Sequence, residues 1–454
     1  MSNVAAERPT DSRLLGVFTL LAGLVLLVLA FGFVGYNWTL PTYVVGCAVV
    51  LCGFGFFADF ESAEKPDAPN IAEQRWATMA DILAEDISDS NGGDNQFPYL
   101  GLVGGDNGGV TTLRYKGPRH LICYGPTRVG KSAAIIIPNL QNLRRSMIVT
   151  DPKGELAAIT AAHRDKFGRV IVLNPFGLLI DKRPHLTSIG WNPLLQLDPE
   201  SDDFSGDAMC IADAIIDRSG DGKSSFFENR AKEFFRAFIM HERITKGREA
   251  SLYHLSSMLS RDLIKTLQAM ALSENKIVGD AGLEFLRRKE DKNSQSSSLE
   301  DVIATIKANI YFLDDIRIGA DMHLADAIDF SALHREIVTI YLILPTEKLE
   351  AQAKWLRLFV NLAIENLIRS ARSDSEATVP PVLFMLDEFG SLGRLECIVK
   401  GLNMAASSRL QLFFFLQNVG QLKNSRLIPL TQVRLYIVAG GHWVAPRFSS
   451  DFRV

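Results

Sequence analysis

The sequence of 454 residues carries a formal net charge of −4, and 47% of its residues are hydrophobic. This length exceeds that of one ordinary domain, so two or three soluble units with a membrane anchor are expected. The near-neutral charge excludes the bulk basic signature of a nucleic-acid-binding protein. The five cysteines show the spacing of neither a disulfide framework nor a metal site, which favours reduced cysteines in a cytosolic soluble part.

Two apolar runs near the N-terminus predict a transmembrane hairpin over residues 1–60. Residues 14–34 and 43–58 contain no charged side chain, and about 20 apolar residues in a helix span the lipid bilayer. Arg8 and Arg13 precede the first run, which places the N-terminus on the cytoplasmic side, and the second run returns the chain to that side. A cleaved signal peptide is the alternative, but the first run is longer than the apolar core of such peptides.

The stretch that follows the anchor is polar and rich in glycine. Residues 88–95 and 101–109 combine serine, aspartate, asparagine and glycine, which are typical of loops. The sequence therefore predicts a linker over residues 61–110 and the first part of a nucleotide-binding domain over residues 111–200.

Short runs rich in β-branched and aromatic residues alternate with helical patterns in the remaining chain. On this spacing they predict an α/β fold, with a largely parallel sheet covered by helices. The expected strands are residues 120–124, 146–150, 169–173, 337–344, 382–386, 411–416 and 433–438, and a helix is expected over residues 131–143.

Residues 201–330 differ from their surroundings because they contain no strong strand pattern. Ser297 and Glu300 form a capping box, S-x-x-E, ahead of apolar residues at helical spacing. This stretch is predicted to be an all-α insertion, after which residues 331–454 form the second part of the nucleotide-binding domain.

Residues 125–132 match the phosphate-loop pattern GxxxxGK[ST] in full, between an expected strand and an expected helix. The glycines let successive backbone N–H groups point at phosphates, assisted by the helix dipole. Lys131 supplies a positive charge to the β- and γ-phosphates, and the Ser132 hydroxyl is placed to bind Mg²⁺. The pattern predicts ATP and Mg²⁺ as cofactors. The candidate nucleotide-binding residues are Gly125, Pro126, Thr127, Arg128, Val129, Gly130, Lys131 and Ser132.

A second acidic motif completes the predicted site. An apolar strand over residues 382–386 delivers Asp387 and Glu388 at its carboxyl end, where parallel sheets bind ligands. Asp387 is the candidate Mg²⁺ ligand beside Ser132, and Glu388 is the candidate general base for the attacking water. Gln417 follows another strand, where an amide could sense the γ-phosphate or orient the water. A simple cap at the end of the strand is the alternative for Gln417.

Several sequence motifs between about residues 110 and 425 are distinctive. They include residues 125–132 with Ile137-Pro138-Asn139-Leu140, Val149-Thr150-Asp151-Pro152-Lys153-Gly154-Glu155, His163-Arg164, Leu173-Asn174-Pro175-Phe176, Trp191-Asn192-Pro193-Leu194, residues 386–393 (LDEFGSLG) and Gln417-x-x-x-Gln421-Leu422. Together they resemble the type IV secretion coupling proteins, the hexameric ATPases of bacterial conjugation.

The resemblance implies a RecA-like nucleotide-binding domain, an all-α domain facing the cytoplasm and a hexameric ring. It implies an inner-membrane ATPase that delivers a relaxase–DNA complex, carrying single- or double-stranded DNA, or effector proteins to the inner-membrane components of a secretion channel. Lys131, Ser132, Asp387, Glu388 and Gln417 would keep the roles given above. Asp151 and Lys153 would lie near the nucleotide; the alternative is a Pro-Lys-Gly turn after a strand.

The chain departs from the family pattern at two places. The loop between the two apolar runs is short for the family. The similarity to the family motifs ends after about Leu422, which suggests a C-terminally truncated or altered product. Two other functions therefore stay open: a septal-type membrane-tethered DNA translocase, and a docking protein that does not hydrolyse ATP. Arg394 and Arg409 are candidates for the arginine that a neighbouring subunit would supply, with an exposed surface arginine as the alternative.

Overall fold

The computed structural model divides into two units, Met1–Trp76 and Ala77–Val454. It describes residues 87–89, 95–104, 110–126, 128–216, 224–290, 297–323, 327–373, 378–388, 408–417, 433–439 and 442–444. The first unit and both predicted membrane spans lie outside these residues. Within the described ranges, no helix combines the length and the apolar character that crossing a membrane requires.

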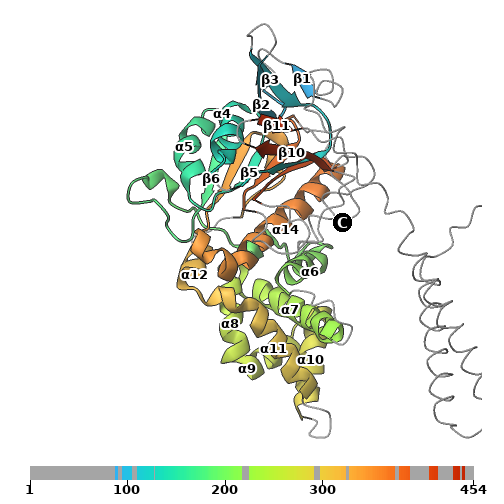
Figure 1. Cartoon of the computed structure of the whole chain (residues 1–454). Helices are drawn as coiled ribbons and strands as arrows, with labels where there is room; N and C mark the ends of the chain where they lie inside the picture. The colour runs from blue at the N-terminus through green and yellow to red at the C-terminus, as the bar shows by residue number, and fades with distance from the viewer. Residues whose placement is uncertain are drawn as a thin grey trace, which may run out of the picture. The chain divides into compact units, whose positions relative to one another are not determined.

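An eight-stranded sheet forms the centre of the second unit (Figure 1). Its strand order is β11-β10-β4-β9-β8-β5-β7-β6; every neighbouring pair from β10 to β6 is parallel, and β11 is antiparallel to β10. This confirms the predicted α/β fold with a largely parallel sheet. The strands are β4 (His120–Tyr124), β5 (Met147–Thr150), β6 (Arg169–Leu173), β7 (Val338–Leu342), β8 (Val382–Leu386), β9 (Leu410–Leu416), β10 (Val433–Ala439) and β11 (His442–Val444).

The central strands are buried on both faces, which explains why they read as continuous apolar runs. In β9, Leu412 and Phe414 belong to one hydrophobic core, whereas Phe413 and Phe415 belong to a second core on the opposite face. Alternation of side chains across a strand produces this division. The first core contains α14 (Leu349–Ser373), and the second contains α4 (Ile137–Asn142) and α5 (Glu155–Arg164). The sheet is therefore covered on both sides.

A small antiparallel sheet precedes the large one and corrects the linker prediction. Strands β1 (Ile87–Asp89) and β2 (Tyr99–Gly104) lie within the predicted linker, and both pair with β3 (Val110–Tyr115). The sequence misleads because its glycines are typical of loops. Here Gly101 has a φ of 154°, and the β2–β3 register shifts between Tyr99 and Gly101. The glycine serves a strand irregularity.

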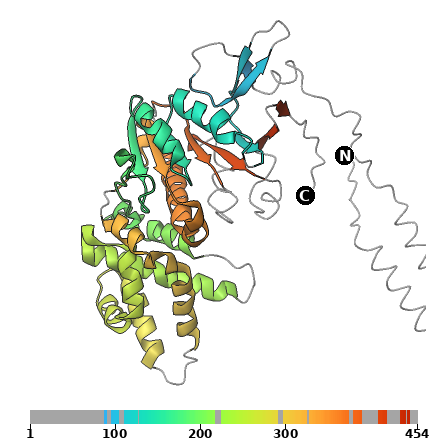
Figure 2. The same cartoon turned by 60° about the vertical axis from the view of Figure 1, so that its left-hand side comes forward.

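Between β6 and β7 the described residues hold helices and no strand (Figures 1 and 2). The longer helices are α6 (Phe204–Ile215), α7 (Ser224–Lys246), α8 (Leu252–Ser260), α9 (Leu263–Ala271), α10 (Lys276–Glu290), α11 (Ser297–Ile310) and α12 (Ile316–His323). Shorter segments are η3 (Pro184–Leu186), η4 (Pro193–Gln196), η5 (Gly247–Glu249), η6 (Tyr311–Asp314) and α13 (Ala332–Arg335), and η7 (Thr346–Lys348) precedes α14.

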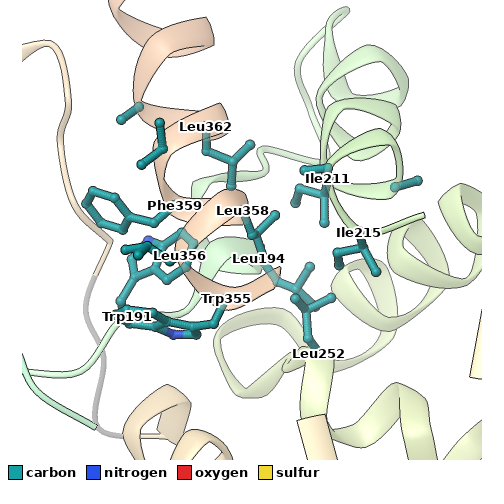
Figure 3. Packing of buried hydrophobic residues seen from close by; sticks show 14 of the residues in the cluster. Trp191, Leu194, Ile211, Ile215, Leu252, Trp355, Leu356, Leu358, Phe359 and Leu362 are labelled. Carbon is teal, nitrogen blue, oxygen red and sulfur yellow. The ribbon is translucent and has the colours of Figure 1, made fainter. Parts of the chain in front are cut away.

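This helical region shares its core with α14. The Trp191 ring lies edge-on to Trp355 and Phe359 of α14, with ring centroids 6.0 and 4.9 Å apart (Figure 3). One continuous buried cluster joins these residues to Ile211 of α6 and Leu252 of α8. The boundaries predicted for the insertion, residues 201–330, stay a prediction, because the packing is continuous across them.

Candidate nucleotide-binding site

Three neighbouring parallel strands bring the predicted site residues to one edge of the sheet. Strand β9 lies between β4 and β8, with Tyr124 opposite Leu416 and Leu386 opposite Phe414. The Gly125 N–H donates to the Leu416 carbonyl at 3.1 Å, which continues this ladder beyond the strand. The phosphate loop, Gln417 and the acidic pair therefore start from adjacent strand ends, where open parallel sheets bind ligands.

The backbone of the phosphate loop has the curvature that anion binding requires. Arg128 and Gly130 have φ values of 65° and 90°, in the left-handed region. Alternation between left- and right-handed residues directs successive N–H groups into one concavity, which attracts anions. A Cβ built on Gly130 would meet no atom within 4 Å, so the space beside it is open. The loop fits a phosphate group; Thr127 lies outside the described residues.

The Lys131 ammonium folds back over this loop. Its Nζ donates to the carbonyl oxygens of Gly125 at 2.5 Å and Pro126 at 3.1 Å. The ammonium thus already lies at the loop, on a flexible stem that can turn toward an anion. The Ser132 side chain is exposed at the start of the following helix and is free of the hydrophobic core.

The helix after the loop begins as a π-helix, which differs from the single α-helix predicted over residues 131–143. Segment η2 (Ser132–Ile136) leads into α4, and the Ile137 N–H donates to the Ser132 carbonyl five residues back. Pro138 lacks an N–H, and its ring would clash with the carbonyl four residues earlier in a regular α-helix. The wider turn relieves that clash. Such π-turns often occur at functional sites.

The acidic pair is held by a local hydrogen-bond network at the end of β8. The Thr150 hydroxyl donates to the Asp387 carbonyl at 2.9 Å, and the Glu388 N–H donates to Asp387 Oδ1 at 3.0 Å. Glu388 adopts a left-handed φ of 55°, which costs a non-glycine residue roughly 1–2 kcal/mol. Both side chains are half-buried. This backbone turn points to a residue held in place for its side chain.

The electrostatics of the site suit a cation beside Asp387. Burial, followed by the charge of Glu388, raises the pKa of the Asp387 carboxyl to about 6, and Lys131 opposes this rise. A divalent cation would reverse that shift by stabilising the charged carboxylate. The Asp387 carboxylate and Ser132 hydroxyl are the oxygen ligands that Mg²⁺ prefers, with phosphates and waters completing its shell. These residues therefore fit Mg²⁺.

Gln417 contacts the acidic pair directly. Its Nε2 donates to Glu388 Oε1 at 2.5 Å. Of the predicted catalytic residues, Glu388 and Gln417 are therefore in contact, while Lys131 lies on the neighbouring loop. The amide can hold a carboxylate or a water, since it offers both donors and an acceptor.

Asp151 has a structural role that the sequence left open. Its Oδ2 accepts the Ala157 N–H at 2.8 Å, at the start of α5. Burial raises the pKa of this carboxyl to about 6, and the backbone N–H groups of Ala157, Leu156, Lys153 and Gly154 oppose the rise. Gly154 has a φ of 68°, and the Lys153 side chain is exposed. The segment forms a turn before α5. The charge of Asp151 also raises the pKa of Asp387, and the predicted place of Asp151 and Lys153 near the nucleotide stays a prediction.

Arg164 is a buried structural residue that sequence reasoning missed. Its guanidinium donates to the carbonyls of Leu143 and Arg145, the latter at 2.7 Å, and to the Thr339 hydroxyl at 2.8 Å. It satisfies carbonyl groups where α4 ends and β5 begins. These hydrogen-bond partners are distant from Arg164 in the sequence, so the only available signal was the His163-Arg164 motif.

Arg409 lies away from the predicted site in this chain. It precedes β9 and donates through Nη2 to the Val379 carbonyl at 2.6 Å. Gln417 follows the other end of the same seven-residue strand, roughly 26 Å away at the usual rise per residue. Arg394 lies outside the described residues.

Comparison with known proteins gives consistent matches. A family model described as type IV secretory system conjugative DNA transfer matches residues 70–427. Two conjugal transfer proteins TraG of Escherichia coli are 25% and 27% identical, covering 77% and 72% of this chain and 58% and 52% of their own lengths. Protein VirD4 of Rhizobium radiobacter is 27% identical over 67% of this chain and 42% of its own. The chain thus spans less than two thirds of these relatives.

Solved structures of the bacterial conjugative coupling protein TrwB are similar at lower identity. The unbound form is 17% identical, with a TM-score of 0.47, and covers 71% of this chain and 69% of its own. The form in complex with ADP and Mg²⁺ is 16% identical, also with a TM-score of 0.47, and covers 71% and 70%.

Proposed function

The chain belongs to the type IV secretory system conjugative DNA transfer family, and from this membership we propose that it is a coupling ATPase of a type IV secretion system. The observation that best supports hydrolysis is the contact of Gln417 with Glu388 at the sheet edge that also carries the phosphate loop. Candidate base, water-orienting amide and phosphate-binding lysine come from three adjacent strands.

Each side chain has a distinct role in the proposed hydrolysis of ATP. Lys131 exchanges its bonds to the loop carbonyls for the β- and γ-phosphate oxygens. Glu388 accepts the proton of the attacking water, and Gln417 orients that water from the adjacent strand. Ser132 and Asp387 would hold Mg²⁺, which neutralises charge on the phosphates when bound.

The proposed cargo and partners follow from the family. DNA with its relaxase, or effector proteins, would be delivered to the inner-membrane part of a secretion channel by a homo-hexamer. The predicted hairpin would anchor this assembly in the inner membrane, with both termini in the cytoplasm. The apolar runs of the sequence support the anchor, and VirD4 and TraG support the choice of family.

ATP turnover by the purified full chain, with and without single-stranded DNA, tests the proposal. Lys131→Ala should abolish turnover because the phosphates lose their positive partner. Lys166→Ala, at an exposed position after α5, is the matched control and should behave as the wild type. DNA-stimulated turnover that is lost only in Lys131→Ala would support a coupling motor. ATP binding without turnover would contradict it and favour a docking protein.

A further inference from the structure

Asn139 connects the helix of the phosphate loop to the small sheet through a buried carboxamide. The residue lies in α4 and is 0% exposed. Its Oδ1 accepts the Tyr99 N–H at 2.7 Å, and its Nδ2 donates to the Tyr99 carbonyl at 2.8 Å and the Ile135 carbonyl at 2.8 Å. Both N–H groups of the amide are used, on two different elements.

On the side that faces β2, the Asn139 carboxamide makes the hydrogen bonds that a neighbouring strand would otherwise make. Strand β2 is an edge strand, because the small sheet has the order β1-β3-β2. An edge strand presents unpaired N–H and carbonyl groups, and the Asn139 amide satisfies one of each at Tyr99. Towards the phosphate loop, its partner Ile135 belongs to the π-helix that begins at Ser132.

The small sheet is also joined to the phosphate loop through the chain itself. Strand β3 ends at Tyr115, and β4, which carries the loop, begins at His120. The chain runs from β2 through β3 and β4 to the phosphate loop, and then through η2 to α4. Asn139 of α4 contacts β2 again, so the small sheet and the phosphate loop are joined both by the chain and by this side chain. The Arg144 N–H adds a bond to the Asn95 carbonyl at 2.7 Å, just before β2.

Resting on the proposed function, we infer that Asn139 is a positioning residue that couples occupancy of the phosphate loop to the three-stranded sheet. When Lys131 turns from the Gly125 carbonyl to a phosphate, any shift of Ser132 passes along η2 to Ile135. Tyr99 must follow, since buried polar groups that separate would be left without partners. The small sheet thus responds to nucleotide, and its position in turn sets the affinity of the loop, because such coupling is reciprocal.

Hydrogen exchange of the full chain tests this coupling. Exchange at residues 99–102 is measured without ligand, with Mg²⁺ and ADP, and with Mg²⁺ and a non-hydrolysable ATP analogue. In the wild type, nucleotide should slow exchange there by about fivefold or more. Because loss of Asn139 alone speeds exchange of Tyr99, each variant is judged by its own ratio with and without nucleotide.

Asn139→Leu should remove the response and weaken nucleotide affinity by about fivefold, leaving kcat at saturation less affected. Asn139→Asp keeps the acceptor for the Tyr99 N–H but loses both donors, so it should also lose the response. It serves as the test if Asn139→Leu fails to fold. Asn142→Leu is the matched control. This exposed amide of the same helix donates only to the Pro138 carbonyl at 2.8 Å, and its variant should respond as the wild type does.

The outcomes separate the two proposals. A wild type that binds nucleotide without a change at residues 99–102 overturns the coupling and leaves the proposed function intact, as does a full response in folded Asn139→Leu. A wild type that binds no nucleotide overturns the proposed function, and this appears in the binding measurement before any exchange is recorded.

Discussion

The amide of Gln417 donates from Nε2 to Oε1 of Glu388 at 2.5 Å, across the neighbouring strands β9 and β8. Glu388 presents this oxygen from a left-handed backbone. The pairing links the candidate base to the residue proposed to orient its water, so the two side chains should act as one unit.

The first prediction is that substitutions at these two positions are not additive. Glu388→Gln should lower kcat by about 10²–10⁴-fold, the usual contribution of a general base. Gln417→Leu should lower kcat less, and the double variant should be no slower than Glu388→Gln, since the base that Gln417 assists is already absent. Steady-state turnover of the four proteins measures this. Independent, multiplying losses would show that the contact has no role in turnover.

The second prediction concerns pH and the Mg²⁺-free protein. Burial raises the pKa of Asp387 from 3.8 to about 6. A carboxyl whose pKa is higher in the folded state stabilises the fold when it is protonated. Its contribution to the free energy of unfolding is complete below about pH 4 and is lost as the pH rises through about 6. Asp387→Asn should therefore be more stable than wild type at pH 7, by up to about 3 kcal/mol, with no advantage below pH 4.

Urea unfolding between pH 4 and 8 measures this difference. The matched control is Asp165→Asn, at an exposed position after α5, which should show no such gain. Parallel stability curves for the wild type and Asp387→Asn across this range would contradict the proposed burial of the charge.

The third prediction is that Arg164 stabilises the fold and has no part in chemistry. Arg164→Met removes donors from three buried groups and should lower the free energy of unfolding by roughly 2–5 kcal/mol. The control is Arg144, whose exposed side chain covers the Phe167 ring, and Arg144→Met should cost below about 1 kcal/mol. Nucleotide affinity per folded molecule should not change in either variant. A selective loss of affinity in Arg164→Met would contradict a purely structural role.

The fourth prediction is that the helical region and the sheet unfold together. Trp191 packs on α14 in a core that includes both regions, so Trp191→Ala should lower stability by roughly 3–5 kcal/mol. Hydrogen exchange should report equal losses of protection in α7 and β8. The control is Phe226→Ala, because Phe226 is 61% exposed. Loss of protection confined to the helices would mean that they form an independent domain.

The sequence predicted the parallel strands well because burial on both faces leaves an unmistakable apolar run. The bounds of β4, β6 and β8 match the expected residues. The site residues that follow such strands could also be placed, since parallel strand ends meet at one edge.

Other features depend on contacts that sequence patterns do not carry. Asn139 meets Tyr99 forty positions away, and Arg164 meets Thr339 at a separation of 175. Strands β1 and β2 lie in the stretch predicted as a linker, because its glycines were interpreted without the partner strand β3. The π-turn results from Pro138, whose presence in an otherwise helical pattern signals a distortion but not its form.

The two cores lie on opposite faces of the sheet, so adjacent residues of β9 can report separately on each core. Phe413 lies in the core that includes the phosphate-loop helix, and Phe414 lies in the core that extends into the helical region. Fluorine labels at these consecutive positions would give two resonances from one strand. One would report motion near the nucleotide, and the other would report rearrangement among the helices, so the order of the two events could be followed in a single molecule.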